Sequence, residues 1–164
     1  MNTPIRMACL VLALAPAFAV AAEKSYMTLV GDLLAATESP RMIREYCAKR
    51  APVTDALNTR MYEIWAMRHK DLLGAVAEQL ARANVRLKNQ GAPGGDRPID
   101  SMRKIASERL EQALLGTTQA EVERYCGGYP QLIEKKDKEA ETSIRQLLSV
   151  VEYADRMLTE QERT

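Results

Sequence analysis

Apolar residues recur at helical spacing along most of this chain. The longest such stripe covers residues 53–87, with charged residues on the opposite face. It consists of Val53, Leu57, Met61, Trp65, His69, Leu72, Val76, Leu80, Ala83 and Leu87. The pattern predicts one continuous helix over residues 53–88, opened by Pro52, with Gly74 as the point where it bends.

Two shorter helical segments precede this stripe. Met27, Val30 and Leu33 are spaced by three residues and predict a short amphipathic helix over residues 26–36. Ser39 followed by Pro40 suits an N-cap and the first helical position, so a second short helix is expected to begin there and to end near Cys47.

The second half of the chain repeats this order after a glycine-rich loop predicted at residues 89–98. A helix is expected from Pro98 to near Gly116, and Thr118 and Glu121 have the spacing of a capping box that starts a short helix. Pro130 begins the last helix. The stripes of the two longer helices comprise Ile99, Met102, Ala106, Leu110 and Ala113, and then Ile144, Leu147, Val151, Ala154 and Leu158.

These elements predict an all-α fold, an antiparallel four-helix-bundle-like domain with two long and several short helices. Composition agrees, because aromatic residues make up only 5% of the chain while helix-forming residues are abundant. The two halves match in order, each with a short helix ending in Tyr-Cys, then a proline, then a long helix. Duplication is one explanation of this match.

Residues 1–22 have the parts of a secretory signal peptide, with Arg6, a short apolar run and small residues suited to cleavage. A membrane anchor is the alternative, although the run is shorter than the roughly 20 residues that span a bilayer. We expect residues 23–164 to form a single helical domain, periplasmic or secreted, with no membrane span after cleavage. Without Arg6 the chain has 22 basic and 22 acidic residues, which favours no nucleic-acid partner.

Export would place the cysteines in an environment where disulfides can form. Removal of Cys9 with the signal leaves Cys47 and Cys126, and an oxidising compartment allows them to form a disulfide. We predict this bond as the staple between the two halves. Free thiols and an intermolecular bridge are the alternatives.

Catalytic and cofactor patterns are lacking. His69 is the only histidine, and neither a nucleophile elbow, a phosphate-binding loop nor a haem-attachment motif occurs. The sequence therefore favours a protein that is not an enzyme and needs no cofactor. A structural role is expected for His69, and the alternative is that Met61 and His69 bind copper.

Two functions follow from these exclusions. The favoured one is a protein–protein interaction factor, acting as an inhibitor, immunity-type or chaperone-like partner of an envelope or secreted protein. Its candidate interaction face is Tyr62, Trp65, Met67 and Arg68, residue types enriched at interfaces. The alternative is a helical bundle that binds copper, haem or a hydrophobic ligand in a cavity lined by Met61, Trp65, His69 and Met102.

The tail Leu158-Thr159-Glu160-Gln161 resembles the LTxxQ motif of the CpxP/Spy family of periplasmic helical chaperones. The resemblance covers four residues, and the glutamine stands one position earlier than in the motif. No residue role is transferred from that family.

Overall fold

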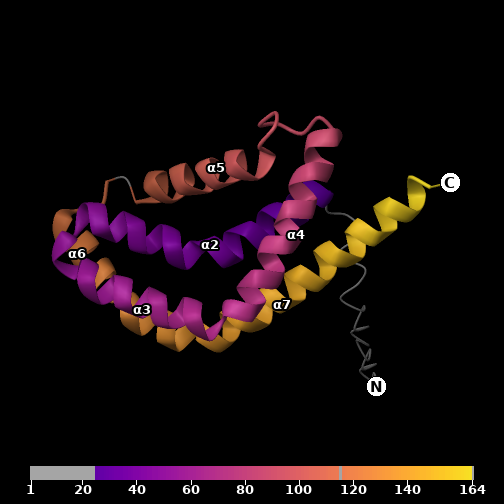
Figure 1. Cartoon of the computed structure of the whole chain (residues 1–164). Coiled ribbons are helices and arrows are strands. Elements are labelled where there is room, and N and C mark those ends of the chain that lie inside the picture. Colours follow the sequence, from indigo (N-terminus) through magenta and orange to yellow (C-terminus); the bar gives the residue numbers. More distant parts are fainter. Residues whose placement is uncertain (1–24, 115, 164) are drawn as a thin grey trace, which may run out of the picture.

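The computed structural model describes residues 25–114 and 116–163, and these fold into six α-helices and one short 3₁₀-helix without any strand (Figure 1). The predicted signal peptide lies outside the described residues. Within them, no helix is long and apolar enough to cross a membrane.

The first helix, α2 (Tyr26–Arg50), is continuous, so the predicted break before Pro40 was wrong. Proline has no N–H for the preceding turn. Three neighbouring carbonyls of that turn accept from hydroxyl groups: Thr37 Oγ1 donates to the carbonyls of Leu33 and Leu34, and the Ser39 hydroxyl donates to that of Ala35. Because α2 buries side chains on both sides of Pro40, packing keeps the helix intact.

One continuous helix was predicted over residues 53–88, and this was wrong, because the structure has three elements there. They are η1 (Pro52–Thr54), α3 (Asp55–Arg68) and α4 (Lys70–Asn89). The break lies at His69, whose φ of −102° and ψ of 16° leave the helical region, rather than at Gly74. Its imidazole Nε2 lies 2.7 Å from Asp137 Oδ1 on α7, a contact that fixes the bend.

The remaining elements match their predictions closely. They are α5 (Pro98–Ala113), α6 (Gln119–Gly127) and α7 (Tyr129–Gln161). Thr118 and Glu121 form the capping box at the start of α6, and Pro130 stands in the first turn of α7. Three glycines in the loop before α5 have positive φ, namely Gly91, Gly94 and Gly95.

The helix α2 lies at the centre of the molecule and contacts every other helix (Figure 1). It runs antiparallel to α7, since Tyr26 bonds Asp155 near the end of α7 while Tyr129 at its start bonds the carbonyl of Pro40. It runs parallel to α5, as the Arg103–Glu38 and Lys49–Glu111 ion pairs show.

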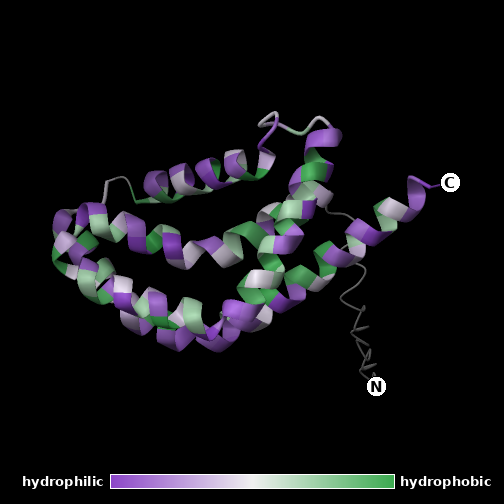
Figure 2. Ribbon diagram, in the orientation of Figure 1, coloured by the Kyte–Doolittle hydropathy of each residue, from purple (hydrophilic) through white to green (hydrophobic). Residues whose placement is uncertain are grey.

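The main core lies where α2, α4 and α7 meet, and apolar residues gather there in Figure 2. Its members include Leu33 and Leu34 from α2, Trp65 from α3, Leu80 and Leu87 from α4, and Ile144 and Val151 from α7. In contrast, α5 buries only Pro98 and Ile99 at its start. The rest of α5 therefore lies at the edge of the molecule, against α2 and α4.

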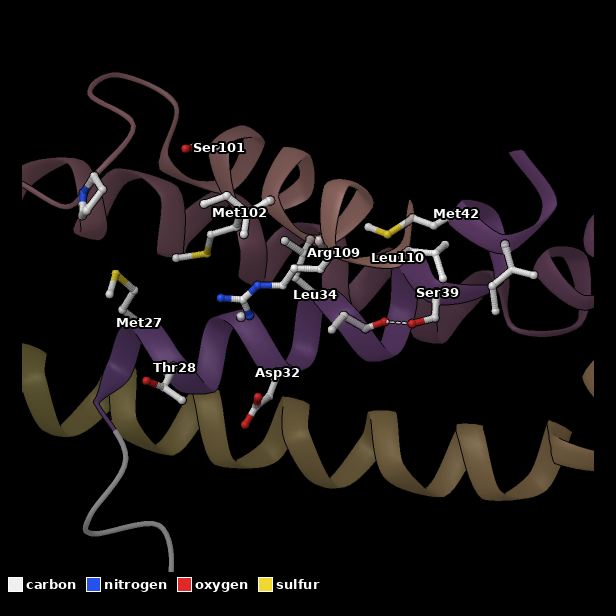
Figure 3. Close-up of a pocket in the computed structure, with 16 residues that line it drawn as sticks. Met27, Thr28, Asp32, Leu34, Ser39, Met42, Ser101, Met102, Arg109 and Leu110 are labelled. Atoms are coloured by element: carbon white, nitrogen blue, oxygen red, sulfur yellow. Dashed lines mark hydrogen bonds between the residues drawn. The ribbon is translucent and has the colours of Figure 1, made fainter. Parts of the chain in front are cut away.

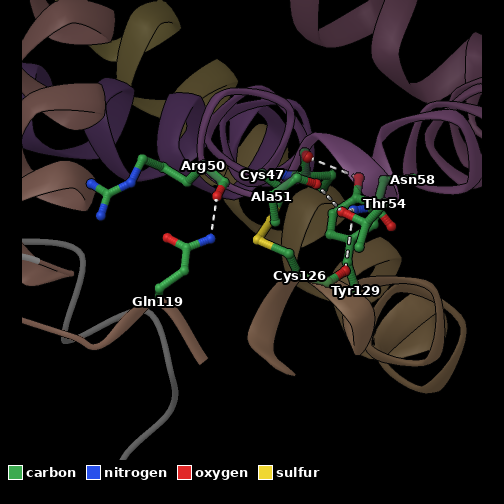
Figure 4. Close-up of a disulfide and its surroundings, with 9 residues drawn as sticks. Cys47, Arg50, Ala51, Thr54, Asn58, Gln119, Cys126 and Tyr129 are labelled. Atoms are coloured by element: carbon green, nitrogen blue, oxygen red, sulfur yellow. Dashed lines mark hydrogen bonds between the residues drawn. A yellow bond between two sulfur atoms is a disulfide. The ribbon is translucent and has the colours of Figure 1, made fainter. Parts of the chain in front are cut away.

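A second, smaller core surrounds a disulfide at the far end of α2. Cys47 and Cys126 are joined, with Cα atoms 5.4 Å apart, which confirms the predicted pairing (Figure 4). Both are fully buried, together with Tyr46, Ala51 and Val122. The bond links the junction between α2 and α3 to the junction between α6 and α7.

Candidate functional site

A groove of about 610 Å³ lies between α2 and α5 and is open to solvent along one side. Its walls are mainly apolar, and three of its side chains are methionines (Figure 3). The apolar lining consists of Met27, Leu34, Ala35, Met42, Ile43, Pro93, Met102, Ile105, Ala106 and Leu110.

The groove is lined by both small and large side chains from the two helices. On α5, Met102, Ala106 and Leu110 share one helix face at spacings of four residues, and that face is turned toward α2. On α2, Gly31 lines the groove, and a Cβ added there would meet no atom within 4 Å. The two helices are therefore held side by side without filling the space between them.

Ion pairs join α5 to α2. Arg103 Nε on α5 donates to Glu38 Oε1 on α2 at 2.9 Å, and Arg103 also pairs with Asp100 on its own helix. Farther along, Lys49 lies 3.6 Å from Glu111. These contacts tether α5 to α2 through polar groups, which leaves the apolar walls free.

Two charged side chains line the groove itself, Asp32 on α2 and Arg109 on α5. Asp32 already has an interaction of its own within the protein. Arg109 reaches from α5 into the space between the helices, on the side of Asp32 and away from Met42 (Figure 3). Its guanidinium makes no hydrogen bond or ion pair with any residue that the structure describes.

The predicted interaction face is divided between the interior and the surface. Trp65 is only 3% exposed, and its indole ring lies between the rings of Tyr62 and His69, with centroids 6.1 and 5.3 Å away. Tyr62 is partly buried under the guanidinium of Arg44. Met67 is 70% exposed, and Arg68 pairs with Asp137. These four residues do not form one continuous surface.

An exposed apolar stripe does follow the outer face of η1 and α3. Val53 is 87% exposed, Leu57 55%, Ile64 43% and Met67 70%. The sequence pattern assigned Val53 and Leu57 to the buried stripe, and this was wrong. The buried positions of α3 are Asn58 and Trp65 instead, since the break at His69 turns α3 relative to α4.

His69 is almost fully buried and held by polar contacts that explain its place in the fold. Its Nε2 bonds Asp137, which also accepts from Arg68. Burial alone would raise the pKa of the Asp137 carboxyl, but the hydrogen bonds from His69 and Arg68 hold it below its ordinary value. Across the described residues, no cluster of three or more histidine, cysteine or acidic side chains could hold a metal ion.

Only one of the four residues predicted to line a ligand cavity lies in the groove between α2 and α5. Met102 lines the α2–α5 groove, whereas Met61, Trp65 and His69 belong to α3 and the bend that follows it. The sequence identified the apolar stripe of α5 and placed only Met102 from it in a ligand cavity. Arg109 and Gly31 were missed, because only the pairing of α2 with α5 shows that their faces meet across open space.

A buried amide secures the disulfide end of the molecule. Asn58 Nδ2 on α3 donates to the carbonyl of Cys126 at 3.1 Å and to Thr54 Oγ1 at 3.0 Å (Figure 4). Gln119 Nε2 donates to the carbonyl of Arg50 at 2.9 Å. Because both sulfurs are fully buried, the bond has the character of a structural staple.

Comparisons with protein-family models, with curated proteins and with solved structures find no match.

Proposed function

We propose that this protein is a binding protein without catalytic activity, and that it takes a hydrophobic ligand into the groove between α2 and α5. The observation that carries the proposal is the groove itself, an apolar hollow of about 610 Å³ between two tethered helices. Ligand sites in proteins commonly have volumes of roughly 300–1,000 Å³ and mainly apolar walls with a few polar groups. The α2–α5 groove has these properties.

The methionines favour this function over a purely structural gap. Met27, Met42 and Met102 are unbranched and polarisable, and such side chains adapt to ligands of differing shape. A disulfide further fits an oxidising compartment outside the cytoplasm. We therefore propose a periplasmic or secreted location, in line with the signal expected at residues 1–22.

Binding is tested with a neutral hydrophobic fluorophore, N-phenyl-1-naphthylamine, whose emission rises in apolar surroundings. The fluorescence of Trp65 is a poor reporter of binding, since Trp65 lies in the main core and does not line the groove. The test variant is Gly31→Leu, which places a side chain in the groove. The matched control is Gly74→Leu on α4, because an added Cβ there also meets nothing within 4 Å.

We expect saturable binding by the wild-type protein and by Gly74→Leu, and binding weaker by about tenfold or more in Gly31→Leu, since the added side chain occupies part of the apolar volume. Circular dichroism establishes that both variants are folded. No saturable binding by the wild-type protein, or equal binding by both variants, would overturn the proposal.

A second candidate function is supported by the exposed stripe Val53, Leu57, Ile64 and Met67. We propose this stripe as the contact surface for a protein partner, because exposed apolar side chains on one helix face are typical of interaction sites. It replaces the face centred on Trp65 in the interaction hypothesis.

Site-specific photocrosslinking tests this second function in the native compartment. A benzophenone amino acid at Leu57 is expected to yield one discrete adduct, while the same group at exposed Lys138 on α7 yields none. Ile64→Glu should abolish the adduct without loss of folding. Equal adduct patterns from Leu57 and Lys138 would refute a specific contact at α3.

A further inference from the structure

We infer that the ligand of the α2–α5 groove is a single extended hydrocarbon chain with an anionic head group, as in a long-chain fatty acid, and that Arg109 binds the head group. This inference rests on the proposed function and names the chemical class of its ligand. It follows from the length of the apolar groove and from the charge on its lining.

The groove is long. Along α2 its lining runs from Met27 to Ile43, which corresponds to about 24 Å at 1.5 Å per residue. Most of the side chains along that length are apolar. A groove of this kind is suited to one extended hydrocarbon chain that lies along it.

Among the described residues, the lining has one exposed cation without a hydrogen-bond or ion-pair partner. Among the basic side chains near the groove, Arg103 is occupied by Glu38 and Asp100, and Lys49 by Glu111. Arg109 has no such contact with the described residues, although Figure 3 shows it between the two helices. A guanidinium can donate two parallel hydrogen bonds to a carboxylate, which makes it a specific site for an acidic head group.

Apolar walls continue from Arg109 along the groove. Beyond its aliphatic stem lie Leu110 on α5 and Met42 and Ile43 on α2, at the end toward the disulfide. Arginine covers apolar surface with its methylene groups while its charged end stays polar. A carboxylate at the guanidinium would thus leave the attached chain in contact with apolar side chains.

Calorimetric titration with two compounds of equal chain length tests the head group. Dodecanoate has the anionic carboxylate, and dodecanol has a neutral hydroxyl. Each is titrated into the wild-type protein, Arg109→Gln and the control Arg60→Gln, which removes an exposed arginine on α3 outside the groove. Because a charged hydrogen bond is involved, we expect dodecanoate to bind the wild-type protein about tenfold or more tightly than dodecanol.

Arg109→Gln should lower the affinity for dodecanoate to the level of dodecanol and leave dodecanol binding unchanged, while Arg60→Gln changes neither. Equal binding of the two compounds by the wild-type protein, or no effect of Arg109→Gln, would overturn the inference and leave the proposed hydrophobic site intact. Failure of both compounds to bind, or binding that Gly31→Leu does not weaken, would overturn the proposed function itself. Tighter binding of an amphipathic helical peptide at the groove would also overturn the inference.

Discussion

Single polar side chains determine where this helical protein departs from its own hydrophobic pattern. His69 continues the apolar stripe by spacing, yet it ends α3 and begins α4. Its ring contacts Trp65 on one side and Asp137 on the other. A buried polar group requires a hydrogen-bond partner, and the partner here lies on α7. The bend therefore follows from the position of Asp137.

Asp137 makes the stability of the protein sensitive to acid. Its pKa is lowered in the folded state from an ordinary value of 3.8, despite burial, by hydrogen bonds from His69 and Arg68. A carboxyl of this kind contributes stability that is complete above its unfolded pKa and is lost as the pH falls through its folded pKa. Asp137→Asn should therefore be less stable than wild type at neutral pH.

The pH profile distinguishes this role from simple packing. Over roughly pH 5 to 2, the free energy of unfolding should fall less steeply in Asp137→Asn than in the wild-type protein, as measured by urea titration at each pH. Glu78→Gln serves as control, since Glu78 is exposed on α4. Parallel profiles for wild type and Asp137→Asn would mean that this carboxylate is not linked to folding.

At the scale of helices, local signals predicted the ends of the elements better than their continuity. The capping box at Thr118 and the proline at 130 were read correctly, because the chemistry that ends or begins a helix is contained in a few adjacent residues. Pro40 was misread as a beginning. The packing of α2 on α7 allows the helix to continue, and packing of that kind is not visible in one segment alone.

The cap of α6 permits a test at this scale. Thr118→Ala removes the side chain that accepts from the Glu121 N–H, so we expect it to cost about 1 kcal/mol of unfolding free energy. Thr142→Ala on α7 is the matched control, because the hydroxyl of Thr142 only donates to the Lys138 carbonyl within the same helix. Chemical denaturation measures both. If Thr142→Ala lowers the free energy of unfolding by the same amount, the effect of Thr118→Ala does not come from the helix cap.

At the scale of the whole molecule, the all-α fold and the disulfide were predictable and the groove was not. Helical periodicity and two remaining cysteines sufficed for the first two. The groove depends on how α5 lies against α2, and contacts between the two helices such as Arg103–Glu38 join residues far apart in the sequence. The apolar face of α5 was visible in the sequence, but only the structure shows that this face, which includes Met102 and Leu110, lines an open groove.

The disulfide closes one end of this arrangement, and its removal should weaken the fold as a unit. Cys47 and Cys126 are 79 residues apart, and in the chain-entropy model closing such a loop stabilises a protein by up to about 4.5 kcal/mol. Reduction should therefore lower the urea midpoint substantially. The double variant Cys47→Ala/Cys126→Ala should be destabilised to a similar extent and show no response to reductant.

The helical circular dichroism signal of the reduced protein shows whether it has lost only the disulfide or the whole fold. The main core around Leu33, Leu80 and Ile144 lies away from the disulfide, so the reduced protein should keep its helix content at low urea and unfold at a lower concentration. Circular dichroism during urea titration measures both quantities. If reductant leaves the midpoint of the wild-type protein unchanged while free-thiol labelling reports two sulfhydryls, then contacts such as Asn58 with Cys126 hold this end without the covalent bond.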